Sequence, residues 1–240
     1  MNVPRIKLNV LASPKGLIAG RIRFKNKEGK WIDCNSLSKS GGCLISHELT
    51  ELDFDCSQAK YILVIEKEGI FNQLCQQKFH LMIPCVLITG KGFADYSTRI
   101  LLSKLCKLTT LPLLGICDFN PSGASIIFNY KYGSIRSSKE TSEYCASRLK
   151  WLSILCDDFS SGILSQIPEH QKQPFDSEDY KLVQQLASMP YAKEFPEVMN
   201  QLAKMKSLAF KMELQALYWK GEEFLSQFLS SKILRKQWVL

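Results

Sequence analysis

The stretch PLLGICDFNPSGASIIFNYKY (112–132) decides the fold of this 240-residue chain. Its first part, PLLGIC (112–117), is a short apolar run, which indicates a buried β-strand. Its last part, GASIIFNYKY (123–132), is a helix candidate, and the Asp, Asn, Pro and Gly residues between the two parts favour a turn. The stretch therefore predicts a strand–turn–helix unit with a carboxylate, Asp118, and an amide, Asn120, at the strand tip.

Two similar units precede this stretch. YILVI (61–65) and PCVLIT (84–89) are strand candidates, and GIFNQLCQQKF (69–79) and DYSTRILLSKLCKL (95–108) carry apolar residues at helical spacing. Asp95 is expected to cap the second of these helices. Strands that are apolar throughout are typical of a parallel sheet covered on both faces. The β-α-β-α-β-α order thus predicts an α/β fold, with a parallel sheet flanked by helices.

The flanking regions predict a hairpin and a helical extension. LIAGRIRF (17–24) and WIDC (31–34) surround a polar turn and predict an N-terminal β-hairpin. Residues 160–180 are polar and predict a connecting loop, whereas apolar residues at intervals of three and four over 198–219 predict a C-terminal helix, interrupted near Gly221. We expect a basic segment and hairpin over 1–55, an α/β core over 56–165 and a helical part of the same domain over 166–240.

The composition fits an ordinary soluble globular protein, with 45% hydrophobic and 22% charged residues. No apolar stretch is long enough to span a membrane. Nine cysteines without a CxxC pair indicate reduced, buried thiols of an intracellular protein and do not favour a zinc site. Residues 1–30 hold eight basic residues against Glu28 alone, so that this segment carries +7 of the total charge of +8. This excess suggests a polyanion such as nucleic acid, although without further evidence a solvated basic face explains it better.

Polar residues close all three predicted strands. Glu66 follows the first strand, Lys91 the second, and Asp118 and Asn120 the third. Because the carboxyl ends of parallel strands share one edge of a sheet, we expect these side chains to converge and to suit Mg²⁺ bridging to phosphate. Taken singly, the third tip is better explained by a turn, and Glu66 could be a solvated strand end. The GKG sequence of the second tip lacks the spacing of a phosphate-binding P-loop.

Several segments together resemble a known family. The chain is similar to the Toprim domain of topoisomerase VI A subunits and most closely to their eukaryotic homologues, which make meiotic DNA double-strand breaks. The resemblance covers nearly the whole chain in order, through SPKGLIAGRIRF (13–24), VIEKEGIFNQL (64–74), VLITGKGFADYSTRILLSKL (86–105), GICDFNPSGASIIFNYKYGS (115–134), RLKWLSI (148–154) and KMELQAL (211–217).

The resemblance implies a Toprim fold with a Mg²⁺ site and a DNA-binding surface. The metal ligands would be Glu66, Asp118 and Asn120, of which Asn120 would bind through its neutral carbonyl group. The resemblance also implies contacts to the DNA backbone from Lys67, Lys91, Arg99, Lys131 and Tyr132.

The resemblance further implies a type IIB topoisomerase-like enzyme that cuts DNA through a tyrosine. In this family the tyrosine attacks a phosphodiester and lies in a winged-helix domain that precedes the Toprim domain. The first tyrosine of this chain is Tyr61, so we expect the nucleophile to be absent and the chain alone to bind Mg²⁺ and DNA without cutting. A fragment, an incomplete gene model, a short isoform and a degenerate paralogue all fit this departure.

The implied partners are double-stranded DNA, a second copy of the chain, a partner protein like the B component of topoisomerase VI, and other meiotic break-forming proteins, with no membrane, in the nucleus. Two other functions remain open. A Toprim nuclease or primase would need no tyrosine, and a non-catalytic DNA-binding or scaffold paralogue would not depend on Glu66 and Asp118.

Overall fold

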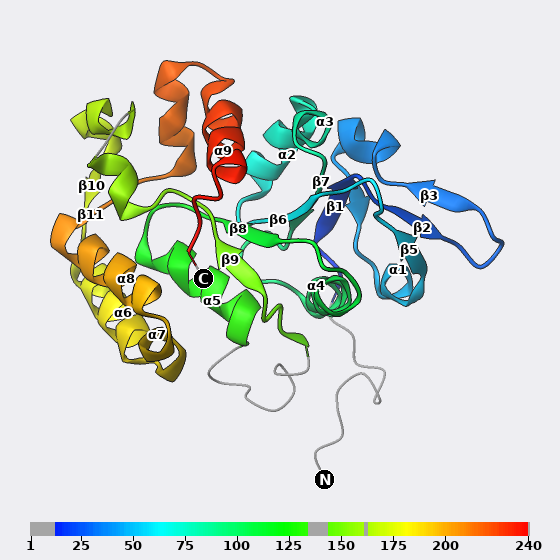
Figure 1. Cartoon of the computed structure of the whole chain (residues 1–240), viewed down its shortest axis with the longest axis horizontal. Coiled ribbons are helices and arrows are strands. Elements are labelled where there is room, and N and C mark those ends of the chain that lie inside the picture. Colours follow the sequence, from blue (N-terminus) through cyan, green and yellow to red (C-terminus); the bar gives the residue numbers. More distant parts are fainter. Residues whose placement is uncertain (1–12, 134–143, 161–162, 240) are drawn as a thin grey trace, which may run out of the picture. The chain divides into compact units, whose positions relative to one another are not determined.

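The computed structural model describes residues 13–133, 144–160 and 163–239 of the chain (Figure 1). They form two units. The first unit holds residues 13–113, 129–133 and 144–149, and the second unit holds residues 114–128, 150–160 and 163–239. Throughout these ranges, no helix combines the length and the apolar character that a membrane span requires.

Four strands of a six-stranded sheet belong to the first unit. Their order is β4 (Cys43–Leu44), β1 (Leu17–Gly20), β7 (Cys85–Thr89) and β6 (Tyr61–Ile65). β6 and β7 are parallel, whereas β1 runs antiparallel to both β7 and β4. All five residues of β7 are buried, as a strand with neighbours on both sides requires. The predicted strands over 61–65 and 84–89 are confirmed, and β1 and β4 extend the sheet with antiparallel pairing that the sequence did not predict.

Helices cover the strands of the first unit, whose helical elements are η2 (Ser36–Ser40), α1 (His47–Glu51), α2 (Glu68–Gln76), α3 (Phe79–Met82) and α4 (Tyr96–Leu108). Figure 1 shows α2 and α3 on one side of β6 and β7 and α4 on the other. α2 buries Ile70, Phe71 and Leu74. Asp95 caps α4 as predicted, because its Oδ1 accepts from the Thr98 amide over 2.8 Å. The predicted α/β fold, a sheet flanked by helices, is confirmed.

The N-terminal hairpin is part of a separate three-stranded sheet. β2 (Arg23–Lys25) pairs with β3 (Trp31–Asp33) on one side and with β5 (Asp53–Asp55) on the other. The segment 17–24 is therefore two strands in two sheets and not one. The chain changes sheets after Gly20, whose φ of 87° and whose position against the Cys85 carbonyl group exclude a Cβ atom.

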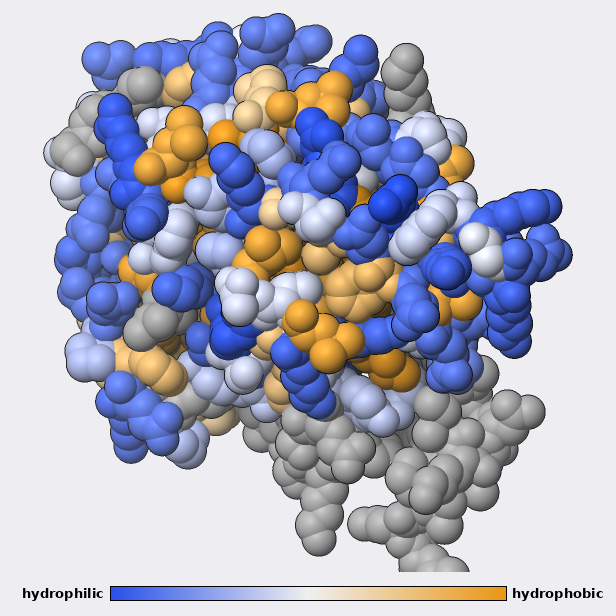
Figure 2. Space-filling model, turned by 45° about the vertical axis from the view of Figure 1, so that its right-hand side comes forward, coloured by the Kyte–Doolittle hydropathy of each residue, from blue (hydrophilic) through white to orange (hydrophobic). Residues whose placement is uncertain are grey.

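Acidic residues offset part of the basic charge of this region. Arg23 lies opposite both Asp33 and Asp55, and its guanidinium group forms an ion pair of 2.9 Å with Asp55. Arg5 and Lys7, which the sequence count included, lie outside the described residues. Figure 2 shows hydrophilic residues over most of the face that it presents, with apolar residues in several separate groups.

The second unit contains the other two strands of the large sheet, the helix after the third predicted strand and the C-terminal region. The elements are β8 (Leu113–Ile116), α5 (Pro121–Tyr132), β9 (Leu149–Trp151), η4 (Cys156–Phe159), η5 (Ile163–Gln166), η6 (Glu169–Gln171), β10 (Gln173–Pro174), α6 (Ser177–Ser188), α7 (Pro190–Glu194), α8 (Pro196–Leu208), β11 (Phe210–Lys211), η7 (Leu214–Lys220) and α9 (Phe224–Leu234). The helices α6, α7 and α8 lie side by side. In the core of this unit, Phe128 of α5 meets Trp151 of β9 edge to face, with ring centroids 6.0 Å apart.

The helical tail predicted over 198–219 is wrong for residues 209–213, which are not helical. Ala209 adopts a left-handed conformation with a φ of 54°, which ends α8. The next residues form β11, which pairs with β10, and helical structure resumes in η7. Apolar spacing persists through both helical parts and conceals the strand between them. Gly221, with a φ of 110°, then separates η7 from α9, as the sequence predicted.

Candidate functional site

Glu66 stands directly after β6, half-buried, at the first predicted strand tip. Its backbone carbonyl group accepts from the Gly92 amide over 2.8 Å and from Thr89 Oγ1 over 3.4 Å. These bonds fasten the end of β6 to the turn after β7. The predicted proximity of the first and second strand tips is therefore present within the first unit.

The second tip presents Lys91 in a strained turn. Lys91 has a left-handed φ of 54°, and its amide donates to Thr89 Oγ1 over 3.1 Å. Its ammonium group lies 3.0 Å from Glu68 Oε1, and both side chains are partly exposed. Lys67, another predicted DNA contact, is the half-buried residue that precedes α2.

A third basic residue, Lys15, joins this tip. Asp95 uses its Oδ2 to accept from the amides of Lys15 and Gly16, over 2.8 and 2.9 Å. The Lys15 ammonium group donates to the Lys91 carbonyl group over 3.3 Å. Sequence reasoning assigned Lys15 only to the general basic excess. The family resemblance included the segment SPKG (13–16), which contains Lys15, but it assigned this residue no role.

Arg99 is buried beneath the second tip and bonds to groups inside the protein. Its guanidinium group donates to the carbonyl groups of Ala94 and Asn129, over 3.4 and 3.1 Å, and to the Asn129 side chain. Burial lowers the pKa of Arg99. The Tyr130 hydroxyl group donates to the Gly92 carbonyl group over 3.1 Å, and burial raises the pKa of this tyrosine. Arg99 and Tyr130 thus brace the loop that carries Lys91.

The last two predicted DNA contacts lie at the end of α5. The Lys131 ammonium group donates to the Leu149 carbonyl group over 2.7 Å and is buried. It lies 5.6 Å from the ring centroid of the half-buried Tyr132. Lys131 therefore connects the end of α5 to the start of β9, and its role toward DNA stays a prediction.

The third strand tip lies in the second unit and is the most buried of the three. Asp118 follows β8, is 5% exposed, and accepts from the Leu214 amide through Oδ1 over 2.8 Å. Asn120 caps α5, since its Oδ1 accepts from the Gly123 amide over 2.6 Å. α5 begins at Pro121, two residues earlier than predicted, with the proline in the first helical position.

Gly123 is required by the close packing of this tip. A Cβ atom there would lie 2.6 Å from the Asp118 carbonyl oxygen and 3.1 Å from the Cys117 side chain. Only glycine lets the first turn of α5 approach the backbone of Asp118 so closely. The DFNPSG sequence thus combines a turn, a helix cap and a buried carboxylate.

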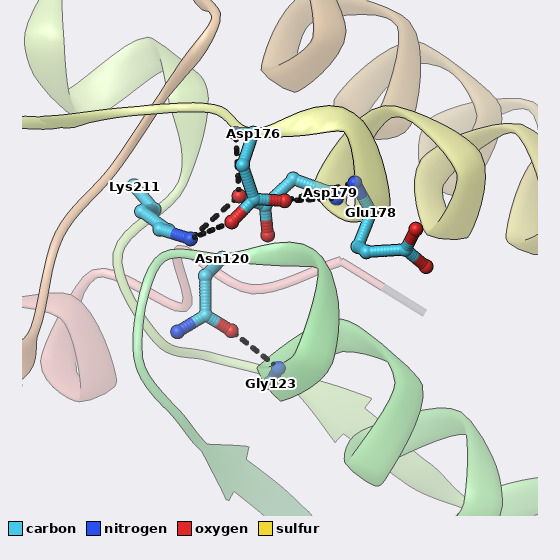
Figure 3. Close-up of polar contacts among 6 residues, drawn as sticks. All are labelled: Asn120, Gly123, Asp176, Glu178, Asp179 and Lys211. Carbon is cyan, nitrogen blue, oxygen red and sulfur yellow. Dashed lines mark hydrogen bonds and ion pairs between the residues drawn. The ribbon is translucent and has the colours of Figure 1, made fainter.

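A cluster that sequence reasoning missed lies beside this tip. Lys211 forms ion pairs with Asp176 and Asp179, over 3.0 and 2.6 Å. Figure 3 shows these three side chains together, in the same view as Asn120 and its bond to Gly123. The family resemblance included the segment KMELQAL (211–217), but its sequence does not indicate that Lys211 pairs with Asp176 and Asp179.

Comparison with known proteins places this arrangement in a family. The family model for the Toprim domain of the topoisomerase 6 A subunit/Spo11 proteins matches residues 61–233. The chain belongs to the topoisomerase 6 A subunit/Spo11 family. The predicted resemblance to this family is confirmed, and the matched residues include all three strand tips and the Lys211 cluster.

Three relatives illustrate the range of this family. The rice (Oryza sativa subsp. indica) protein "Meiotic recombination protein SPO11-2" is 32% identical over 98% of the chain and 60% of its own length. The mouse (Mus musculus) "Meiotic recombination protein SPO11" is 30% identical over 100% of the chain and 60% of its own length. The A subunit of DNA topoisomerase 6 from Arabidopsis thaliana is 30% identical over 98% of the chain and 54% of its own length. The chain thus spans less than two thirds of these relatives.

Toprim domains generally bind divalent metal ions. The predicted ligands are of a suitable chemical type, because the carboxylates of Glu66 and Asp118 and the amide of Asn120 carry the hard oxygen donors that Mg²⁺ prefers. That they bind one ion together stays a prediction. Within the described ranges, no group of three or more His, Cys, Asp and Glu side chains is arranged as a metal site. Because Mg²⁺ keeps several waters and takes only one or two protein carboxylates, a dense cluster is not required. Asn120 Oδ1 already caps α5 and would have to serve the metal through its second lone pair.

Proposed function

We propose that the chain is the Mg²⁺-dependent, DNA-binding Toprim part of a topoisomerase VI A-like protein that makes meiotic double-strand breaks by tyrosine transesterification. The observation that carries this proposal is the buried carboxylate of Asp118 at the tip of β8, in a chain whose family match spans residues 61–233. The Leu214 amide supplies one hydrogen bond to this buried carboxylate, and a bound cation would further offset the cost of its burial.

The metal ligands in this proposal are Glu66, Asp118 and Asn120. When bound, Mg²⁺ would neutralise charge on a phosphodiester of the DNA. Asp118 contributes a carboxylate, and the Leu214 amide orients this carboxylate by donating to its Oδ1. Asn120 contributes a neutral oxygen, so the chain brings two carboxylate charges to the site.

The proposed DNA contacts divide into two groups by exposure. Lys67 and Lys91 are half-buried with reach to solvent, which suits direct contact with phosphate oxygens. Arg99 and Lys131 are 8% and 5% exposed, so we assign them to the support of the loop and helix end that face DNA. Tyr132 stands beside Lys131 and belongs with this second group.

The nucleophile of the proposed reaction is a tyrosine hydroxyl group, which attacks phosphorus. The bond from phosphorus to the 3′ oxygen breaks, so that a free 3′ hydroxyl group is released and the tyrosine stays joined to the DNA 5′ end. The first tyrosine of this sequence is Tyr61, at the start of β6. We propose that these 240 residues, expressed alone, bind Mg²⁺ and DNA and do not cut. The partners that we propose from the family are a second copy of the chain, a partner protein like the B component of topoisomerase VI, and other meiotic break-forming proteins, on chromosomes in the nucleus.

Metal titration of the purified chain tests this function. Mn²⁺ binding, followed by electron paramagnetic resonance and competed with Mg²⁺, should be lost in the double variant Glu66→Ala with Asp118→Ala. The double variant Glu194→Ala with Glu197→Ala is the matched control, since both residues are exposed acids of the second unit. Unchanged affinity in the first double variant would remove the metal assignment.

A cleavage assay tests the proposal that these residues alone do not cut DNA. The chain is incubated with labelled duplex DNA and Mg²⁺, and the products are separated before and after protease digestion. A protein-linked 5′ end made by the chain alone would refute the proposal, and an unlinked, hydrolysed end would support a Toprim nuclease instead.

A further inference from the structure

We infer that residues 210–214 form a brace that holds Asp118 in position, and that Lys211 anchors this brace by binding Asp176 and Asp179. The inference deepens the proposed function, since it rests on Asp118 being a metal ligand. It assigns a positioning role to a segment for which the sequence indicated none. Every residue of the brace and its anchors belongs to the second unit.

The brace contacts Asp118 directly. The Leu214 amide donates to Asp118 Oδ1 over 2.8 Å, and both residues are buried, at 1% and 5% exposure. A backbone amide is a rigid donor, so it fixes the direction of the carboxylate that it binds. Residues that orient a metal ligand in this way commonly govern the affinity of the site.

A pair of backbone bonds fixes the brace to the strand tip. Phe119 and Met212 form an antiparallel bridge in which each amide donates to the other residue's carbonyl group, over 2.8 and 2.9 Å. Three rings pack around the bridge. Phe119 meets Phe159 at 4.8 Å and Phe210 at 5.6 Å between ring centroids. Movement of Met212 would therefore move the backbone next to Asp118.

Lys211 anchors the brace on its outer side. Its ammonium group contacts Asp176 over 3.0 Å and Asp179 over 2.6 Å, and these carboxylates raise its pKa. The same two aspartates form the capping box of α6, in which Asp176 Oδ1 accepts from the Asp179 amide and Asp179 Oδ2 accepts from the Asp176 amide. Figure 3 shows the brace lysine held at the beginning of α6 by these two carboxylates.

Loss of the Lys211 side chain would remove the ion pairs that hold the brace at the start of α6. Without the ammonium group, two carboxylates would face each other at the start of α6, and like charges repel. The short pairing of β10 and β11, which joins Gln173 to Lys211 and Pro174 to Phe210, would be weakened. The hydrogen bond from the Leu214 amide to Asp118 would then be formed for a smaller fraction of the time.

The charge of Lys211 by itself predicts the opposite result. A lysine near a cation site repels the cation, so its removal should strengthen metal binding. Positioning predicts weaker metal binding after the same substitution. The sign of the change in metal affinity therefore separates the two roles.

The hydrogen bond to Asp118 can be removed with a matched pair of variants. Leu214 is the first residue of η7, where proline is tolerated, and Glu213 before it is extended, with a φ of −78° and a ψ of 151°. Leu214→Pro deletes the amide hydrogen and the leucine side chain, whereas Leu214→Ala deletes the side chain only. We expect Leu214→Pro to weaken Mn²⁺ binding by about tenfold or more, and Leu214→Ala, which keeps the amide hydrogen, to weaken it by a clearly smaller factor.

The anchor is tested with Lys211→Met, Lys211→Arg and the control Lys181→Met. Lys181 also pairs with an acid of α6, Glu178, but on the exposed surface. Lys211→Met should weaken Mn²⁺ binding by a smaller factor than Leu214→Pro and should speed hydrogen exchange of the Leu214 amide. Lys211→Arg should restore both measurements, and Lys181→Met should leave both unchanged.

Failure of the inference is distinguishable from failure of the proposed function. Equal Mn²⁺ affinity in Leu214→Pro and Leu214→Ala, or tighter binding in Lys211→Met, overturns the brace while the metal site stands. If the unchanged chain binds no Mn²⁺, the proposed function fails, and hydrogen exchange still decides the brace. An unchanged exchange rate of the Leu214 amide in a folded Lys211→Met chain overturns the anchor.

Discussion

The Lys91 ammonium group lies 3.0 Å from Glu68 Oε1, and this ion pair links the turn after β7 to the first residue of α2, which follows β6. Both side chains are partly exposed, so the pair is held only weakly against solvent and salt. A lysine of this kind can exchange its carboxylate partner for a phosphate. The pair thus offers a direct test of the proposed DNA contact.

Substitution at this pair should shift DNA affinity in two directions. Lys91→Ala should weaken binding to duplex DNA and lower the slope of log affinity against log salt by about 1, because one phosphate contact is lost. Glu68→Gln should strengthen binding, since it removes the competing carboxylate. Fluorescence anisotropy at several salt concentrations measures both changes, and Lys181→Ala, which disrupts a similar surface pair with Glu178, should change neither quantity. Equal salt slopes in Lys91→Ala and the unchanged chain would exclude Lys91 from the DNA contact.

Asn120 combines a helix cap with a proposed metal ligand, and two substitutions separate these roles. Asn120→Ala removes the cap of α5 and should lower the free energy of unfolding by about 1 kcal/mol. Asn120→Asp keeps the cap, since aspartate is an equally good N-cap residue, and adds a carboxylate, so that Mn²⁺ affinity should rise. Chemical denaturation and metal titration give the two readouts. Metal affinity that is unaltered in Asn120→Asp would show that residue 120 is a cap alone.

Gly123→Ala should damage the third strand tip. The new Cβ atom would lie 2.6 Å from the Asp118 carbonyl oxygen, so the start of α5 must shift, at a cost of about 1–3 kcal/mol in the free energy of unfolding. Metal affinity should fall with it, because the backbone of Asp118 moves. Gly69→Ala is the control. It places a Cβ atom in open space within α2 and should stabilise the chain by up to about 1 kcal/mol. A Gly123→Ala chain with unchanged stability and metal affinity would contradict the packing at this tip.

The Asp176–Lys211 pair predicts a stability change at acid pH. Hydrogen bonds from the Asp179 amide and from Lys211 lower the pKa of Asp176 from its ordinary value of 3.8 to about 2. A carboxyl group with a depressed pKa in the folded state stabilises the protein above its ordinary pKa, and this stability is lost as the pH falls through the folded value. The thermal midpoint should therefore drop between about pH 4 and about pH 2 less steeply in Asp176→Asn than in the unchanged chain. Parallel curves for the two chains would contradict this coupling.

The three apolar strands and the start of α4 follow from local sequence. YILVI is β6 in full, and PCVLIT and PLLGIC overlap β7 and β8 within one residue at each end. Asp95 caps α4 as its position indicated. These features depend on apolar runs and on a capping side chain, both of which act over a few residues. The boundary between β1 and β2 was missed because the switch of sheets depends on Cys85, which packs against Gly20 from a distant strand.

The candidate site was predictable only in part. The positions of Glu66, Lys91 and Asp118 after strands could be counted along the chain, whereas the burial of Arg99 and Lys131 could not. Arginine and lysine usually lie on the surface. These two are buried because the carbonyl groups of Asn129 and Leu149 accept hydrogen bonds from their charged ends. Long basic side chains commonly bury their stems in this way, and the sequence does not show where their charged ends lie.

The sequence by itself determined the order of the strands and helices from β6 to α5, the residues at each strand tip and membership of the topoisomerase 6 A subunit/Spo11 family. Only the tertiary structure decided that Leu214 donates to Asp118 across 96 residues of chain, and that Lys211 meets Asp176 and Asp179. The reason is physical. Every residue except proline carries the same backbone amide, so a bond such as that of Leu214 leaves no trace in residue type. It arises when folding brings the segment around β11 beside the tip of β8. The proposed role of Asp118 as a metal ligand depends on that contact.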